Sequence, residues 1–112
     1  MPTERTNASQ TFAALAQRAI EIRTRYDEHN IRLNRPEWGP AEYVQGLMGD
    51  MGTLAKLVMA SNGLRDEDDL HQRLAHELAD CLWSVIVIAD ALDIDLESAF
   101  ESTMSQLETR LS

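Results

Sequence analysis

The sequence predicts an all-α fold, a bundle of four helices. Apolar residues recur at intervals of three and four along four separate segments, which is the spacing of an amphipathic helix. Asn, Gly and Pro residues punctuate the stretches between these segments. The β-branched run 85–88 offers a strand as the alternative, but no second strand candidate is present to pair with it.

The first helix is predicted to follow Ser9 as its cap and to end near Glu28. Residues 29–38 form a loop, and Pro40 occupies the favoured first position of the second helix, which runs to about Ser61. The third begins in the acidic cluster 66–69 and continues to about Leu92. Asp95 caps the last helix, which extends to Leu111.

At 112 residues the chain has room for one domain, and we expect a flexible tail over residues 1–9 and a helical domain over 10–112. A chain this short buries a modest core. The third helix is apolar on every side over residues 82–89, so a second subunit is expected to cover part of it. The sequence therefore predicts a homodimer or a tetramer.

Charge excludes one class of partner. The net charge is −9, and the ten basic residues, of which Lys56 is the sole lysine, are scattered. A nucleic acid polymer is bound through clustered cations, so we do not expect one as a partner. The longest apolar run is far shorter than the roughly 20 residues that cross a bilayer, and residues 1–10 lack the pattern of a signal peptide. We expect a cytoplasmic protein without a membrane partner.

Two carboxylates on the third helix are candidates for chemistry. Glu77 and Asp80 are three residues apart, so both project from one face, just where the helix becomes apolar. A half-buried carboxylate needs a partner, and a metal ion would satisfy both. The alternative is a solvated or salt-bridged pair, for which Arg73 is the basic neighbour at suitable spacing.

The second helix carries a complementary feature. Gly46, Gly49 and Gly52 recur at intervals of three. Together they cost roughly 2–3 kcal/mol relative to alanine, which close approach of another helix or a ligand would offset. If the helix is unbroken, Asp50 and Thr53 face the Glu77 and Asp80 pair, and such hard oxygen ligands favour Mg²⁺ or Mn²⁺.

Other residues leave alternatives open. Trp38 either fills space under the loop or offers a stacking surface for a base. The three histidines, His29, His71 and His76, lack the cysteine spacing of a zinc site and are interpreted as surface or capping residues. Cys81 lies in the apolar run and is interpreted as a small buried hydrophobe.

From Trp38 to Leu111 the sequence resembles the MazG-type all-α nucleoside triphosphate pyrophosphohydrolases. The family pattern is Glu-Glu-x-x-Glu on one helix and Glu-x-x-Asp on the next. The segment Leu74–Leu82 matches the second half of the pattern, as does the turn and helix start over residues 92–100. The first half reads Gly49–Lys56, a form similar to the dCTP-cleaving branch of the family.

The resemblance implies a MazG-like bundle and a Mg²⁺-dependent (or Mn²⁺-dependent) hydrolase acting on acid anhydrides. Such an enzyme converts a (deoxy)nucleoside triphosphate or a related nucleotide to the monophosphate and pyrophosphate. The resemblance also implies that Asp50, Glu77 and Asp80 bind the metal ion and that the Thr53 hydroxyl contributes a contact.

Substrate contacts are expected from Trp38, Lys56 and Arg110. Thr53 stands where the family has its third acid, and the basic residues that many members carry on the last helix are replaced. The alternative interpretation is therefore a catalytically impaired nucleotide-binding or regulatory module.

Overall fold

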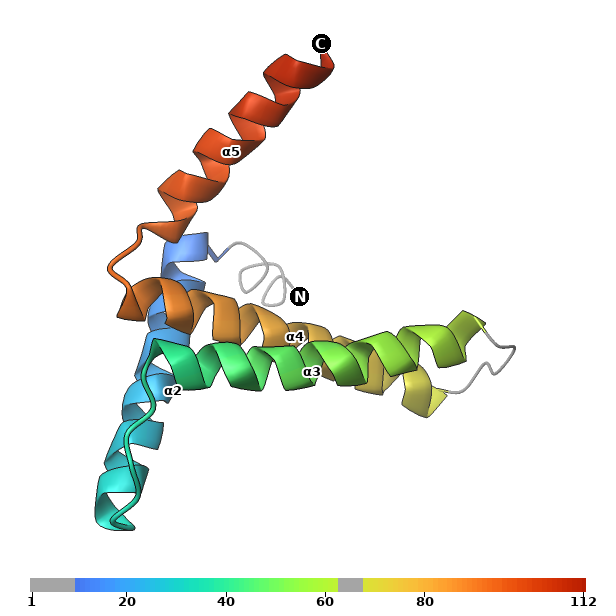
Figure 1. The fold of residues 1–112 in the computed structure, drawn as a ribbon. Helices are drawn as coiled ribbons and strands as arrows, with labels where there is room; N and C mark the ends of the chain where they lie inside the picture. The colour runs from blue at the N-terminus through green and yellow to red at the C-terminus, as the bar shows by residue number, and fades with distance from the viewer. Residues whose placement is uncertain (1–9, 63–67) are drawn as a thin grey trace, which may run out of the picture. The chain divides into compact units, whose positions relative to one another are not determined.

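A computed structural model describes residues 10–62 and 68–112 of the chain. Four helices follow one another: α2 (Phe12–Arg32), α3 (Pro40–Asn62), α4 (Asp68–Ala91) and α5 (Leu96–Leu111) (Figure 1). The described residues contain no strand, which confirms the all-α prediction, and the strand alternative for residues 85–88 is wrong. The predicted tail, residues 1–9, lies outside the described residues.

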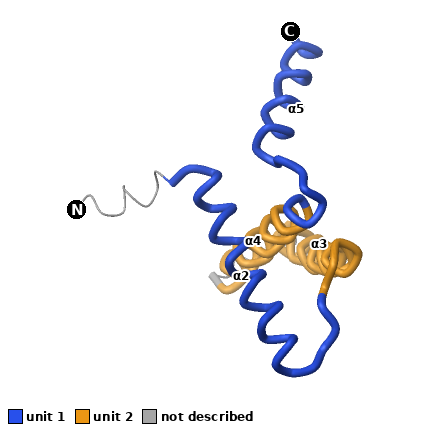
Figure 2. The backbone as a smooth tube through the Cα atoms, turned by 90° about the vertical axis from the view of Figure 1, so that its left-hand side faces the viewer, with its two compact units in different colours: residues 1–37, 89–112 blue, residues 38–88 orange. Residues whose placement is uncertain are grey.

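The chain divides into two compact units (Figure 2). The first unit comprises Met1–Glu37 and Ala89–Ser112, and the second unit comprises Trp38–Ile88. The boundary falls inside α4, whose last three residues belong to the first unit. One domain over residues 10–112 stays a prediction.

Helix α2 begins and ends later than predicted. Its cap is Thr11, whose hydroxyl oxygen accepts a hydrogen bond from the Ala14 N–H at 3.1 Å, whereas the predicted cap, Ser9, lies outside the described residues. The helix continues past Glu28 to Arg32 because its true stop is Asn34. That residue adopts φ 56°, and the Arg35 N–H then bonds to the Asn30 carbonyl at 2.8 Å. Asparagine tolerates this left-handed conformation, which ends helices in the Schellman motif.

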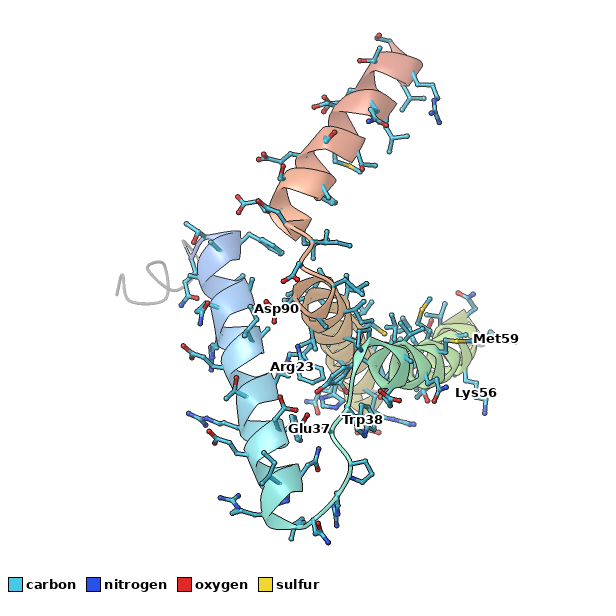
Figure 3. All side chains as sticks on the ribbon, turned by 60° about the vertical axis from the view of Figure 1, so that its left-hand side comes forward. Arg23, Glu37, Trp38, Lys56, Met59 and Asp90 are labelled. Atoms are coloured by element: carbon cyan, nitrogen blue, oxygen red, sulfur yellow. The ribbon has the colours of Figure 1, made fainter. Side chains whose placement is uncertain are left out.

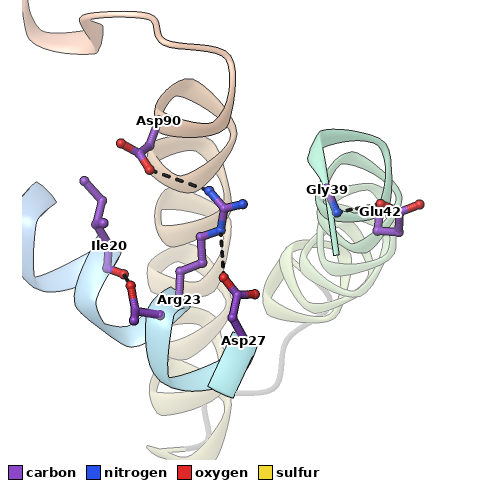
Figure 4. A network of polar contacts seen from close by, with 7 residues as sticks. Ile20, Arg23, Asp27, Gly39, Glu42 and Asp90 are labelled. Carbon is purple, nitrogen blue, oxygen red and sulfur yellow. Dashed lines mark hydrogen bonds and ion pairs between the residues drawn. The ribbon is translucent and has the colours of Figure 1, made fainter. Parts of the chain in front are cut away.

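The start of α3 follows the prediction. Pro40 is its first residue, and the Gly39 N–H that precedes it donates to the Glu42 carboxylate at 2.7 Å (Figure 4). This bond is half of a capping box, with the acidic side chain reaching back over the first turn. The three internal glycines do not break α3, which remains helical to Asn62.

The junction between α4 and α5 is also as predicted. Asp93 adopts φ 56°, and the Ile94 N–H bonds to the Ala89 carbonyl at 2.9 Å, so α4 ends in a second Schellman motif. Asp95 caps α5 by accepting a hydrogen bond from the Ser98 N–H at 3.1 Å. Both aspartates take the backbone conformations that their short polar side chains favour.

Arg23 ties the first unit together. Its guanidinium lies 3.7 Å from Asp27 of the same helix and 3.5 Å from Asp90 in the last turn of α4 (Figure 4). The Arg23 side chain is only 20% exposed. Partial burial reduces solvent screening, so this bridge fixes α2 to the last turn of α4 more firmly than a surface pair would.

In the second unit, α3 and the greater part of α4 run antiparallel and side by side (Figures 1 and 2). The residues at their contact are buried or half-buried. They are Tyr43, Leu47, Asp50, Leu54 and Leu57 on α3, and Leu70, Leu74, Glu77, Cys81 and Ser84 on α4. Their spacing of three and four is that of a packed helix face.

Residues one place after these contact positions lie on one side of the antiparallel pair, because each residue turns a helix by about 100°. We call the exposed apolar residues on that side the apolar stripe. It consists of Val44, Met48, Met51 and Val58 on α3 and Leu78, Leu82 and Val85 on α4. Met48 is 68% exposed and Leu82 is 53% exposed, so the described chain leaves this part of the apolar run uncovered.

Residues one place before the contact positions lie on the opposite side, which we call the polar side. It carries Gly46, Gly49, Thr53 and Lys56 on α3 and Asp69, Arg73, His76, Asp80 and Trp83 on α4. Thr53, Lys56 and Asp80, which the sequence singled out for chemistry, are therefore on one side of the α3–α4 pair, whereas Asp50 and Glu77 lie at the contact.

Candidate metal centre

Glu77 and Asp80 lie together on α4, as their spacing predicted, and His76 joins them. One ring nitrogen of His76 and one carboxylate oxygen from each acid all lie within 4.8 Å of one another. The His76 Nε2 atom is 3.1 Å from the Asp80 Oδ2 atom, across one turn of the helix. Ligands of one small cation are separated by roughly 3–4 Å, so small side-chain rotations would bring these three atoms onto a common ion.

Glu77 carries the clearest sign of a missing partner. Its Oε1 atom is buried, and no described residue donates a hydrogen bond to it. Arg73, the salt-bridge partner that the spacing offered, lies 4.0 Å from Asp69, and no described residue forms an ion pair with Glu77, although His76 pairs with Asp80. A buried carboxylate oxygen without a donor is costly, and a cation is one of the few partners that would satisfy it. The residues present thus fit a divalent ion.

Thr53 approaches this group from α3. A pocket of about 280 Å³ on the polar side is lined by Thr53, Leu57, Asp69, Gln72, Arg73, His76 and Glu77. The Thr53 hydroxyl donates to the Gly49 carbonyl of its own helix at 3.3 Å, so its oxygen lone pairs remain to accept or to coordinate. The structure thus brings Thr53 and Glu77 to one pocket across the helix contact.

Asp50 lies in the α3–α4 contact, half-buried. Burial raises the pKa of the neighbouring Cys81 thiol, and the negative charges of Asp50, Glu77 and Asp80 raise that pKa further. Asp50 is not within the tight group formed by His76, Glu77 and Asp80, and its assignment to the metal stays a prediction.

Trp38 lies at the start of α3 (Figure 3), on the polar side. Its ring packs edge-on against Tyr43 at a centroid distance of 5.3 Å, and Tyr43 packs likewise against Trp83 at 5.7 Å. A Cβ atom at Gly46 would lie 3.4 Å from the Trp38 ring. The neighbour of Gly46 is therefore this ring and not the helix or ligand that was expected, and the distance would admit an alanine methyl group. Trp38 remains 45% exposed.

Gly49 and Gly52 differ from Gly46. Among the described residues, nothing lies within 4 Å of a Cβ atom placed at either position. Their cost in helix propensity has no compensation inside the described chain. A ligand or another molecule would have to supply it.

The two predicted cationic contacts are in different units. Lys56 is exposed toward the far end of α3 (Figure 3), three residues beyond Thr53 on the polar side, and is not among the described residues that line the pocket. Arg110 is exposed in the last turn of α5, in the first unit. Both assignments stay predictions.

Sequence reasoning did not assign five of the pocket residues to the site: Leu57, Asp69, Gln72, His76, and Arg73, which it named only as an ion-pair partner. The interpretation of His76 as a surface residue is right as far as it goes, since 71% of its side chain is exposed. The signal for two of them was in the numbering. His76 is four residues before Asp80 and Arg73 is four before Glu77, which places each pair on one helix face.

Residues 39–111 match the model of the MazG nucleotide pyrophosphohydrolase domain. The match includes the acidic segment of α4 and the α4–α5 junction, on which the sequence resemblance rested. The chain belongs to the MazG family. No curated protein and no solved structure matches it significantly.

Membership in the MazG family bears on the acidic group directly. MazG enzymes hydrolyse nucleotide pyrophosphate bonds and in general use divalent metal ions. Glu77 and Asp80 supply the hard oxygen donors that such ions prefer, and the Oε1 atom of Glu77 has no hydrogen-bond partner among the described residues. Within the described residues, no helix is long and apolar enough to cross a membrane.

Proposed function

We propose that this MazG protein is a Mg²⁺- or Mn²⁺-dependent pyrophosphohydrolase. Its substrate is a (deoxy)nucleoside triphosphate or a related nucleotide, and its products are the nucleoside monophosphate and pyrophosphate. The observation that carries the proposal is the buried Glu77 Oε1 atom, which lacks a donor in the described chain and belongs to a carboxylate grouped with that of Asp80.

Glu77, Asp80 and Asp50 hold the metal in this proposal, and the Thr53 hydroxyl adds a direct or water-mediated contact. When bound, the ion supplies neutralisation of phosphate charge, on which phosphoryl chemistry chiefly depends. The protein's part is positioning, and it is supported by the pocket that Thr53 of α3 and Glu77 of α4 line together.

Arg73 is the nearest cation available to the phosphates. Its pairing with Asp69 spans 4.0 Å between side chains that are mostly exposed, and such surface pairs contribute little. An anionic phosphate entering the pocket can therefore draw the guanidinium away from Asp69. Lys56, one turn beyond Thr53, and Arg110 on α5 are further candidates for phosphate contacts.

Trp38 stacks on the base in this proposal. From Gly46, under the Trp38 ring, to Thr53 the polar side of α3 extends over seven residues, roughly 10 Å at 1.5 Å per residue. Gly49 lies between them and leaves open space above the helix. A nucleotide lying along this line would place its base at Trp38 and its phosphates at the acids.

Self-association completes the proposal. The apolar stripe is a continuous exposed face on two packed helices, and large exposed apolar patches mark interfaces. A second copy meeting this stripe would cover Met48 and Leu82 and leave the polar side open to substrate. We therefore propose a homodimer, or a tetramer built from it.

The function is tested by a screen of ribo- and deoxyribonucleoside triphosphates with Mg²⁺ and with Mn²⁺, measuring released pyrophosphate. We expect metal-dependent release from at least one of them. The release should fall by 10²-fold or more in Glu77→Gln and in Asp80→Asn, because the ion would lose a charged ligand. Glu28→Gln, an exposed acid on α2, is the matched control and should keep full activity.

Two other outcomes would replace the proposal. Thermal stabilisation by nucleotide and metal without any pyrophosphate release would identify a binding or regulatory module that has lost turnover. No change in melting temperature with any nucleotide or metal would leave only a structural helical protein.

A further inference from the structure

Within residues 10–62 and 68–112, the acidic group that could hold a metal ion includes one nitrogen ligand, His76. Its Nε2 atom, not the other ring nitrogen, faces the acids, since it lies 3.1 Å from Asp80 Oδ2. Two ligands in adjacent positions on an octahedral ion with bonds of about 2.1 Å are separated by roughly 3 Å. The two atoms are therefore already at the separation that a shared ion requires.

The helix explains why these residues can share an ion. His76 and Asp80 are four residues apart, the spacing at which paired histidines on one helix face bind a single metal ion. Glu77 follows His76 directly, and its carboxylate completes a group of one nitrogen and two oxygens within 4.8 Å. The pocket beside His76 and Glu77 leaves room for further ligands such as water or phosphate oxygens.

A second role for His76 has to be separated from this one. The same 3.1 Å contact is also compatible with His76 donating a hydrogen bond to Asp80 and only orienting that carboxylate. The two roles differ in one measurable respect. A ligand places a ¹⁴N nucleus on the ion, whereas an orienting residue does not.

We propose that His76 is a metal ligand of this protein, through Nε2, and that it shifts the metal preference from Mg²⁺ toward Mn²⁺. Imidazole nitrogen binds first-row transition metals well, whereas Mg²⁺ favours oxygen donors. This inference rests on the proposed metal site and names a ligand and a selectivity that the acids alone do not provide.

The test uses the full chain with Mn²⁺ alone, without nucleotide. Pulsed electron paramagnetic resonance detects ¹⁴N coupled to bound Mn²⁺, and isothermal titration measures the affinities for Mn²⁺ and Mg²⁺. The chain has three histidines, so the double variant His29→Gln, His71→Gln leaves His76 as the sole imidazole. We expect the ¹⁴N coupling in the wild type and in that double variant.

His76→Gln is the decisive variant. We expect it to lose the ¹⁴N coupling and to weaken Mn²⁺ binding by about tenfold or more, since loss of even an indirect partner of a metal ligand costs about 10–100-fold. The glutamine carbonyl is still an oxygen donor, so Mg²⁺ affinity should change much less. The ratio of the two affinities thus falls.

The outcomes are distinguishable. Mn²⁺ binding without ¹⁴N coupling in the wild type, or with coupling retained in His76→Gln, overturns the assignment of His76 and leaves the proposed acidic site intact. Absence of Mn²⁺ binding with Mg²⁺ binding retained overturns this inference alone, and absence of binding of both ions overturns the proposed function as well.

Discussion

The indole ring of Trp38 covers Gly46, where a Cβ atom would lie 3.4 Å from ring atom Cζ3. This contact holds the loop before α3 against the helix and forms one end of the row Trp38, Tyr43 and Trp83. Because the distance is that of ordinary van der Waals contact, a methyl group fits beside the ring, and we expect a larger side chain to displace it.

Gly46→Leu is therefore expected to displace Trp38 and to lower the free energy of unfolding by about 1–3 kcal/mol, as overpacking does. In a Trp83→Phe background, where Trp38 is the only tryptophan, the displacement should shift the emission to longer wavelength. Gly49→Leu serves as the control, since no described residue occupies the space above Gly49. An equal spectral shift in both variants would contradict the packing described here.

Gly49 should behave in the opposite way. Gly49→Ala places a methyl group in open space and removes the helix penalty of glycine, so stability should rise by up to about 1 kcal/mol. If the nucleotide lies along α3 as proposed, the same methyl group should raise KM. Thermal unfolding and steady-state kinetics measure the two effects. Gly52 lies about one turn beyond Gly49 and points in a different direction from the helix axis. Gly52→Ala should therefore raise stability without raising KM.

Cys81 reports on the position of Asp50. Burial is the largest cause of the raised pKa of its thiol, and the negative charge of Asp50 is the second largest. A raised pKa lowers the thiolate fraction at a given pH, so alkylation below that pKa should be slower than for an unstructured thiol. Asp50→Asn removes a raising charge and should speed alkylation at pH 8. Glu28→Gln should have no effect, and an unchanged rate in Asp50→Asn would mean that Asp50 lies away from the α4 acids.

The apolar stripe should determine the oligomeric state. Leu82→Glu places a charge in the middle of the apolar stripe. Because the core of an interface is depleted of charged residues, this change should convert the oligomer to monomer at micromolar concentration. Leu111→Glu is the matched control, because Leu111 is 84% exposed but lies outside the stripe, at the end of α5. Sedimentation velocity distinguishes the two. A wild-type monomer would contradict the proposed self-association outright.

The helices were predictable from the sequence because apolar spacing and caps act locally. Pro40, Asp93 and Asp95 lie where the local rules put them. The end of α2 was misjudged because residues 29–33 contain no strong breaker, and only the left-handed conformation of Asn34 ends the helix. That conformation depends on the chain beyond it, which a local pattern does not contain.

The acids of α4 were predictable for the same reason, since a spacing of three fixes a shared face. What the sequence could not show was which neighbour each polar group would take. Arg73 stood at equal spacing from Asp69 and Glu77, and only the folded side chain, directed to Asp69, leaves the Glu77 Oε1 atom without a donor. Likewise, the contact of Trp38 with Gly46 could not be predicted from the sequence, and a stacking role for Trp38 stays a prediction.

Glu77 allows the metal site to be tested through stability alone. Without metal, its buried oxygen has no donor in the described chain, so Glu77→Gln should raise the free energy of unfolding by about 1 kcal/mol by removing the charge. With Mg²⁺ or Mn²⁺ at 100 times its Kd, the wild type should gain about 2.7 kcal/mol, and the variant should gain almost nothing. For a domain near 100 residues, each kcal/mol moves the Tm by about 4–8 °C.

Thermal unfolding with and without metal measures both effects in one series. Glu28→Gln should follow the wild type under both conditions, because Glu28 is exposed on α2. A variant that is less stable without metal and still responds to metal would show that Glu77 stabilises the helix contact and does not bind the ion. A metal ligand lowers the free energy of unfolding without metal and is needed for the increase that metal causes. An ordinary acid does not combine these two effects, because only a ligand carries an unfavourable buried charge that the cation neutralises.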